Sequence, residues 1–277
     1  MSRRWRKSRR RWIAAAVAAA GWANTTGASG GACAGQELAP DFHVTEAMKT
    51  LYGNFDQTKG ESTFVMKEAG PEGAFFPKGA TVKVQPYFVQ SAEDSGTIKV
   101  FFLTQGIPAQ DEPFDCHACA PLIGAAVFAK KDGAWTVEAR DLDSTIAGGW
   151  GRPPEARLLR IGPRKKGVEL KVGGGGQGVT VVGVSILVPW NGSVSEALVQ
   201  IISDDNGGYC GNEEGMMPCY STHTSIGFVK GENTEYDDVI VKTAGTRLSK
   251  SAPYKAEKVD ETERRVLRNG KYVSPLH

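Results

Sequence analysis

After residue 60, apolar residues recur in short runs that alternate with polar residues, which is the pattern of β-strands with one buried face. In the run from Val168 to Val172, three valine or leucine residues alternate with Glu169 and Lys171. The longest apolar stretch extends from Gln177 to Pro189 and is predicted to lie in the core. Runs of this kind occupy residues 82–88, 98–104, 125–129, 135–139, 168–172, 177–189, 197–202, 225–229 and 239–241.

These runs predict a mainly β fold with about ten short strands. No helical run long enough for the crossover helix that two parallel strands require separates them. We therefore expect one antiparallel sandwich- or barrel-like domain over residues 43–250, with one short N-terminal helix.

Threonine, glycine and proline mark where several predicted elements begin and end. A helix is expected from Thr45 to Tyr52, where apolar residues recur at helical spacing, with Thr45 as its cap and Gly53 as its end. Pro86 lacks an N–H group and therefore places its strand at a sheet edge. The glycine-rich segment Gly173–Gly178 is predicted to be a hairpin loop.

The clearest hairpin is predicted to turn at Asp132-Gly133, because this pair readily adopts the positive φ angles that a tight β-turn requires. It joins two of the apolar runs named above. Because side chains alternate along a strand, Trp135, Val137 and Ala139 are expected to face the same side.

The first 23 residues have the layout of a bacterial-type export signal. A basic head without acidic residues is followed by the apolar run Ile13–Ala20 and by small residues up to Ala23. The apolar run is much shorter than the roughly 20 residues needed to span a bilayer. We expect cleavage after Ala23 or after Ala34, and a periplasmic or secreted mature protein. The basic residues of the head are Arg3, Arg4, Arg6, Lys7, Arg9, Arg10 and Arg11.

The segment Ser8-Arg9-Arg10-Arg11-Trp12-Ile13 resembles the twin-arginine transport signal, in which a serine or threonine and two arginines precede apolar residues. The resemblance implies export by the twin-arginine route. The general secretory route is the alternative, since an arginine-rich head contains paired arginines easily.

Composition separates both ends of the chain from the predicted β domain. Residues 24–42 are rich in Gly, Ala, Ser and Thr and are expected to form a disordered linker. Residues 251–277 are highly charged, and the Asn269-Gly270 pair within them predicts a small hairpin.

Charge and hydropathy exclude two classes of partner. The chain has 33 Lys and Arg against 31 Asp and Glu, but seven of the basic residues lie in the leader. The mature chain therefore has 26 basic and 31 acidic residues, a net charge of −5. It lacks the basic excess typical of nucleic-acid binding, and no apolar run after Ala23 is long enough to span a membrane.

Four cysteines are expected to form two local disulfides. Paired cysteines in an exported protein are oxidised by default, and the spacing pairs Cys116 with Cys119 and Cys210 with Cys219. The fifth, Cys33, is removed if cleavage follows Ala34.

The Cys116-His117-Ala118-Cys119 motif has a redox alternative. Thiol–disulfide oxidoreductases use a low-pKa thiolate in such a motif, but they place it at the start of a helix beside a parallel sheet. Here a predicted antiparallel hairpin follows, so we favour a structural clip. The cysteine spacing does not supply the four ligands of a zinc site, and no cofactor is predicted.

The acidic loop that begins at Asp204-Asp205-Asn206 is the one candidate for a metal ion. Asp204, Asn206 and Glu213 or Glu214 offer the oxygen ligands that calcium prefers. The spacing departs from that of an EF-hand, and Asp-Asn-Gly is good turn chemistry without any ion. We therefore expect a turn and no metal.

The sequence contains no recognisable catalytic constellation. The segment Gly183-Val184-Ser185-Ile186-Leu187 lacks the final glycine of a nucleophile elbow. We expect non-catalytic binding of a cell-envelope or protein ligand outside the cytoplasm, through loops that carry Trp150, Trp190 and residues 204–206. The alternative is an exported enzyme, either the oxidoreductase above or a hydrolase whose site the sequence does not reveal.

Overall fold

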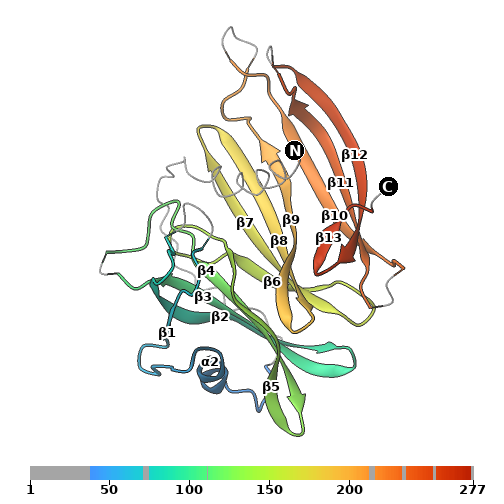
Figure 1. The fold of residues 1–277 in the computed structure, drawn as a ribbon. Helices are drawn as coiled ribbons and strands as arrows, with labels where there is room; N and C mark the ends of the chain where they lie inside the picture. The colour runs from blue at the N-terminus through green and yellow to red at the C-terminus, as the bar shows by residue number, and fades with distance from the viewer. Residues whose placement is uncertain are drawn as a thin grey trace, which may run out of the picture.

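The structure, a computed structural model, consists of two antiparallel sheets and one short helix (Figure 1). The mainly β, antiparallel sandwich- or barrel-like fold predicted from the sequence is therefore confirmed. The residues that the structure describes are 38–70, 75–110, 112–211, 216–232, 235–251 and 254–275. Within these ranges, no helix has the length and apolar character needed to cross a membrane.

Each sheet is a meander, because every strand pairs with its neighbour in sequence. The five-stranded sheet contains β1 (Ser62–Val65), β2 (Thr81–Asp94), β3 (Thr97–Pro108), β4 (Leu122–Lys131) and β5 (Ala134–Ile146). The eight-stranded sheet contains β6 (Glu155–Arg160), β7 (Lys166–Gly176), β8 (Val179–Trp190), β9 (Ser193–Asp205), β10 (Ser221–Val229), β11 (Asp238–Leu248), β12 (Ala256–Arg268) and β13 (Lys271–Val273). The described residues thus form 13 strands, more than the sequence pattern predicts.

The five-stranded sheet lies between helix α2 (Val44–Tyr52) and the eight-stranded sheet (Figure 1). Residues 99–104 of β3 are buried on both faces for this reason, whereas Thr97 and Ile98 at its start are exposed. Phe102 belongs to the core that contains Met48 of α2, whereas Phe101 belongs to the core that contains Leu170 of β7. A charged side chain within this buried stretch therefore has no exposed face to occupy.

Helix α2 begins one residue earlier than predicted. Its N-cap is His43, which makes no side-chain cap hydrogen bond, so the prediction of Thr45 as the cap is wrong and Thr45 lies inside the first turn. Gly53 ends the helix in the left-handed conformation, with a φ of 77°, as predicted. Its N–H donates to the carbonyl oxygen of Lys49.

Two sequence predictions about special residues have different outcomes. The prediction of a long glycine loop is wrong, because Gly173–Gly176 continues β7 and pairs with Val179–Val182, which leaves only Gln177-Gly178 as the turn. Pro86 lies in β2 beyond Thr81–Val84, the part that pairs with β1. Strand β2 as a whole is interior, between β1 and β3, so the edge prediction holds only locally: Pro86 has no partner on the β1 side, and the register with β3 shifts between Pro86 and Phe88.

A β-bulge at Glu138 changes which way β5 faces. Neighbouring residues of β4 pair with Val137 and Ala139, so Glu138 is the extra residue between them. The prediction that Trp135, Val137 and Ala139 share one face is therefore wrong. Ala139 lies in the core between the sheets, whereas Trp135 and Val137 pack on the side of α2. The hairpin turns at Asp132-Gly133, as predicted.

Some predictions concern residues outside the described ranges. These are the export signal 1–23, cleavage after Ala34, the fate of Cys33, the linker as far as residue 37, and the metal candidates Glu213 and Glu214. The charged segment 251–277 contributes β12 and β13, which turn at Asn269-Gly270 and continue the eight-stranded sheet.

Candidate functional site

Both predicted disulfides are present, Cys116–Cys119 and Cys210–Cys219. The first lies in the connection between β3 and β4, which are antiparallel neighbours. Strand β4 follows it directly, so its context is that of a structural clip and differs from that of a redox motif at a helix start. Within the clip, the N–H of Cys119 donates to the carbonyl oxygen of Cys116 over 2.9 Å.

The clip holds a strained tryptophan. Trp150 lies between β5 and β6, has a φ of 55° and is 52% exposed. A bulky residue rarely adopts this left-handed backbone, which costs on the order of 1–3 kcal/mol. Two hydrogen bonds hold the turn: the N–H of Trp150 donates to the carbonyl oxygen of Cys116 (3.1 Å), and the N–H of Gly151 donates to that of Cys119 (2.7 Å).

Phe75, Phe114, His117 and Trp150 form two neighbouring aromatic pairs, which we call the aromatic surface. Phe75 is 44% exposed and meets the ring of Phe114 edge-on, with the ring centres 5.2 Å apart. The ring of His117 lies 5.3 Å from the indole of Trp150. Gly151 joins the two halves, since a Cβ atom there would lie 2.0 Å from the carbonyl oxygen of Phe114. The two exposed rings thus share one tightly packed support.

A pocket of about 210 Å³ lies where the two sheets meet. Trp190, at the end of β8, forms one wall, and its ring centre lies 5.5 Å from that of Tyr236. The hydroxyl of Tyr236 donates to the carbonyl oxygen of Pro189 over 2.7 Å. Burial raises the pKa of Tyr236 to about 12, so this hydroxyl is neutral at physiological pH. Polar side chains complete the lining: Asp94, Lys99, Glu138, Lys165, Asn191 and Glu235.

Three of these polar groups form an ion triad, in which Lys99 and Asp94 are buried and the side chain of Glu138 is 40% exposed. Lys99 is only 6% exposed, and its Nζ lies 2.8 Å from Oδ1 of Asp94 and 2.6 Å from Oε1 of Glu138. Burial by itself lowers the pKa of Lys99, but the hydrogen bonds and charges of the two carboxylates outweigh it, and the pKa is raised. Oδ2 of Asp94 also accepts the backbone N–H of Lys166 over 2.7 Å, which ties the two sheets together.

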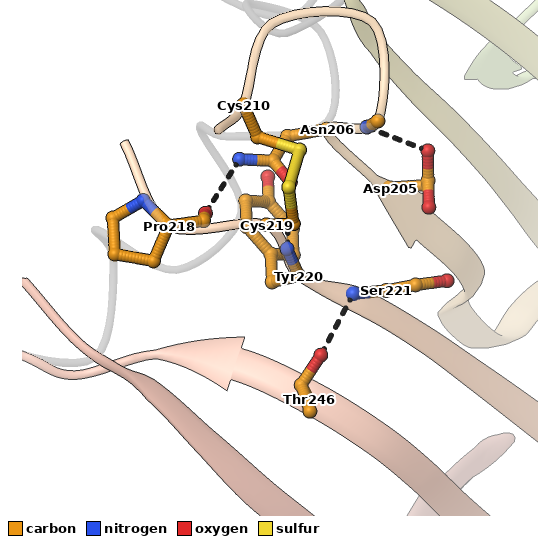
Figure 2. The surroundings of a disulfide bond; sticks show 9 residues. Asp205, Asn206, Cys210, Pro218, Cys219, Tyr220, Ser221 and Thr246 are labelled. Carbon is orange, nitrogen blue, oxygen red and sulfur yellow. Dashed lines mark hydrogen bonds between the residues drawn. A yellow bond between two sulfur atoms is a disulfide. The ribbon is translucent and has the colours of Figure 1, made fainter. Parts of the chain in front are cut away.

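Beside the Cys210–Cys219 disulfide, the side chain of Asn206 connects the segment before the disulfide loop to the segment at its end (Figure 2). Asn206 is 3% exposed and uses both ends of its amide. Its Nδ2 donates to the carbonyl oxygen of Pro218 (3.0 Å), and its Oδ1 accepts the N–H of Tyr220 (2.7 Å). This amide oxygen is therefore already engaged within the protein.

The two carboxylates that precede Asn206 in the chain also have protein partners. Oδ1 of Asp205 accepts the N–H of Gly207 (2.8 Å), which is turn chemistry, and Oδ1 of Asp204 accepts the hydroxyl of Tyr220 (3.1 Å). Burial raises the pKa of Asp204. The described residues contain no group of three or more His, Cys, Asp or Glu side chains that could hold a metal ion. The other two calcium candidates, Glu213 and Glu214, lie outside those residues.

A second hollow, of about 270 Å³, lies on one face of the eight-stranded sheet. Val184, Ile202 and Ile226 line it together with charged residues from β6 and β7. Two of these, Arg157 and Glu169, pair with each other over 2.7 Å. This ion pair already engages the side chains of Arg157 and Glu169 within the protein.

The structure distributes the contact residues named from the sequence over three places. Trp150 belongs to the aromatic surface and Trp190 to the pocket between the sheets, whereas residues 204–206 lie at the end of β9, before the disulfide-closed loop. Sequence reasoning missed the ion triad. Its one sequence signal is Lys99, a charged residue inside an otherwise apolar strand.

No protein-family model matches the chain, and no curated protein or solved structure shows significant similarity to it. The geometry of these sites is therefore the basis for assigning a function.

Proposed function

We propose that this protein is exported and binds a cell-wall glycan through the aromatic surface, without catalysing a reaction. The observation that carries the proposal is Trp150, an exposed tryptophan held in a strained backbone conformation by a disulfide-clipped loop. Strained residues persist only where their surroundings over-determine them, and they concentrate at functional sites. Loops positioned by a rigid β scaffold commonly carry binding residues.

The aromatic surface has the physical properties of a binding anchor. Large aromatic rings supply much contact area and lose few rotatable bonds on binding. Phe75 and Trp150 are both exposed, and each packs edge-on against a second ring, Phe75 against Phe114 and Trp150 against His117. The apolar faces of sugar rings in a glycan strand are flat enough to lie against such rings. Two disulfides and the N-terminal signal pattern support export, because disulfides persist in oxidising compartments.

One observation favours a second candidate, a thiol–disulfide oxidoreductase. Cys116 is exposed whereas Cys119 is buried, so one sulfur of the pair is open to attack by a thiol. The antiparallel context and the structural bonds from both cysteines to the Trp150 turn weigh against it. Reduction of insulin by the purified protein, lost in Cys116→Ser, would favour this candidate over the clip.

Co-sedimentation with isolated peptidoglycan sacculi tests the binding proposal. Trp150→Gly removes the ring and keeps a residue that accepts the positive φ, so the turn is retained. We expect at least a tenfold loss of sacculus binding and no loss of melting temperature. Tyr254→Ala, at a similarly exposed aromatic residue on another part of the chain, should bind like the wild type. Wild-type protein that fails to sediment with sacculi would overturn the glycan assignment, and equal binding by Trp150→Gly would overturn the site.

A further inference from the structure

The pocket at Trp190 is assembled from segments that are far apart in sequence. Asp94 ends β2, Lys99 lies on β3, Glu138 is the bulge residue of β5, and Asn191 occupies the β8–β9 turn. The backbone N–H of Arg140 donates to the carbonyl oxygen of Gly192, which fastens that turn to β5 over 3.2 Å. The pocket is therefore a product of how the two sheets meet.

Two charges of the ion triad, Lys99 and Asp94, are buried, and the third, Glu138, is 40% exposed at the pocket. Removing charges from water carries a penalty of several kcal/mol per ion unless partners satisfy them. An ammonium group has three N–H donors, and those of Lys99 meet Asp94 and Glu138, which leaves one donor. Glu138 likewise uses Oε1 for Lys99, and Oε2 has no hydrogen bond to a described residue.

Further hydrogen-bonding capacity lies on the opposite wall. The indole N–H of Trp190 and the side-chain amide of Asn191 make no hydrogen bond with any other described residue. Trp190 also supplies an apolar wall together with Pro189. The lining thus combines unpaired donors, an unpaired acceptor and an apolar wall.

This mixture selects a neutral ligand rich in hydroxyl groups. The lining has carboxylates of Asp94, Glu138 and Glu235 and ammonium groups of Lys99 and Lys165, so an ion of either sign meets like charge. A hydroxyl both donates and accepts, so it can bond to Glu138 and to a neighbouring donor at once. The volume of about 210 Å³ is below the roughly 300–1,000 Å³ typical for drug-sized ligands. A ligand of about one ring therefore fits.

We propose that this pocket is a second binding site, independent of the aromatic surface, and that it takes a neutral monosaccharide or a similar single-ring polyol. The triad orients Glu138 and Lys99 toward hydroxyl groups, Asn191 and Trp190 add hydrogen bonds, and Trp190 covers the less polar face of the ring.

Calorimetric titration of the full mature protein with glucose and N-acetylglucosamine tests this site, with glucuronate and glucosamine as charged analogues. We expect at least one neutral sugar to bind at least tenfold more tightly than either charged analogue. Asn191→Gly should weaken that binding about tenfold, equal to about 1.4 kcal/mol, since Gly retains the positive φ of 48° and removes only the amide. Trp190→Phe, which keeps a ring and loses the N–H, should also weaken it.

Matched variants separate this site from general effects on folding. Asp132→Gly likewise replaces a polar turn residue by glycine at a positive φ, 51°, in the β4–β5 turn. This variant should bind the sugar like the wild type. Trp150→Gly should also leave sugar binding unchanged, so failure of the glycan proposal and failure of this one are distinguishable. Absence of binding by both neutral sugars, equal or tighter binding of a charged analogue, or equal weakening by Asn191→Gly and Asp132→Gly would each overturn the proposal.

Discussion

The backbone N–H of Trp150 donates a hydrogen bond to the carbonyl oxygen of Cys116, over 3.1 Å. The next residue repeats the contact, because the N–H of Gly151 meets the carbonyl oxygen of Cys119. Both cysteines of the clip therefore hold the turn that presents the tryptophan. The disulfide stabilises a short loop and, through these two bonds, sets the position of an exposed ring in another connection.

Replacing the clip should loosen Trp150. The double change Cys116→Ser with Cys119→Ser is expected to lower the free energy of unfolding by about 2 kcal/mol, because the closed loop is short. It should also increase the quenching of Trp150 fluorescence by iodide. The Trp150 signal is the difference between the fluorescence of each protein with Trp150 and that of the same protein carrying Trp150→Phe. The matched pair Cys210→Ser with Cys219→Ser should lower stability without changing this quenching. Unaltered quenching in both would contradict the bracing role of the clip.

Gly151→Ala should destabilise the protein more than an ordinary glycine change in a turn. Its Cβ would lie 2.0 Å from the carbonyl oxygen of Phe114, and its φ is 65°. Gly133, with a φ of 82°, has nothing within 4 Å of the equivalent position. Gly133→Ala therefore measures the backbone strain alone, about 1–2 kcal/mol, and Gly151→Ala should exceed it by about 1–3 kcal/mol. Urea unfolding measures both, and equal losses would show that the contact with Phe114 yields easily.

Removing the central charge of the triad should be costly. Lys99→Met leaves Asp94 buried without its ammonium partner, and breaking a buried pair costs about 3–5 kcal/mol. The exposed pair of Lys49 with Glu46 on α2 is the control, and Lys49→Met should cost less than about 1 kcal/mol. Chemical denaturation at pH 7 compares the two. A similar small loss in both would mean that water reaches Asp94 and replaces the lysine.

A carboxylate on β5 predicts a pH dependence. Burial, followed by a hydrogen bond with Asp143, raises the pKa of Asp141 to about 6. The unfolded value is about 3.9, so the folded state binds this proton more tightly and stability falls as pH rises between about 4 and 6. Asp141→Asn should therefore increase stability at pH 7 and have little effect at pH 4, whereas exposed Asp260→Asn should show no such difference. Melting temperatures at the two pH values decide between these results.

Asn206 should matter more for stability than the acidic residues beside it. Asn206→Ala removes two hydrogen bonds and leaves the N–H of Tyr220 and the carbonyl oxygen of Pro218 without partners, at about 1–3 kcal/mol for each buried group. Asp205→Ala removes one exposed turn bond and should cost less than about 1 kcal/mol. Thermal unfolding should show this order of losses in melting temperature. Millimolar calcium should not shift the melting temperature of the wild-type protein. A calcium-dependent rise abolished by Asp204→Ala would contradict the turn interpretation.

Local features of this protein could be predicted from the sequence because they depend on few neighbouring residues. Strand periodicity, the Asp132-Gly133 turn and the Gly53 helix end each follow from backbone preferences within a few positions. The two disulfides follow from short cysteine separations. The errors at Thr45 and Gly173–Gly176 arose where a helix start and a strand end were decided by packing and pairing beyond the local residues.

Tertiary structure alone decided the two candidate sites. Lys99 and Glu138 are 39 positions apart, and Asp94 and Lys166 are 72 positions apart. Only the pairing of strands and the packing of the two sheets bring such groups together, and a single bulge residue changes which face a strand presents. The sequence by itself determined that the chain forms antiparallel strands with clipped loops. Where those loops and strands meet depends on long-range packing, which no local pattern encodes.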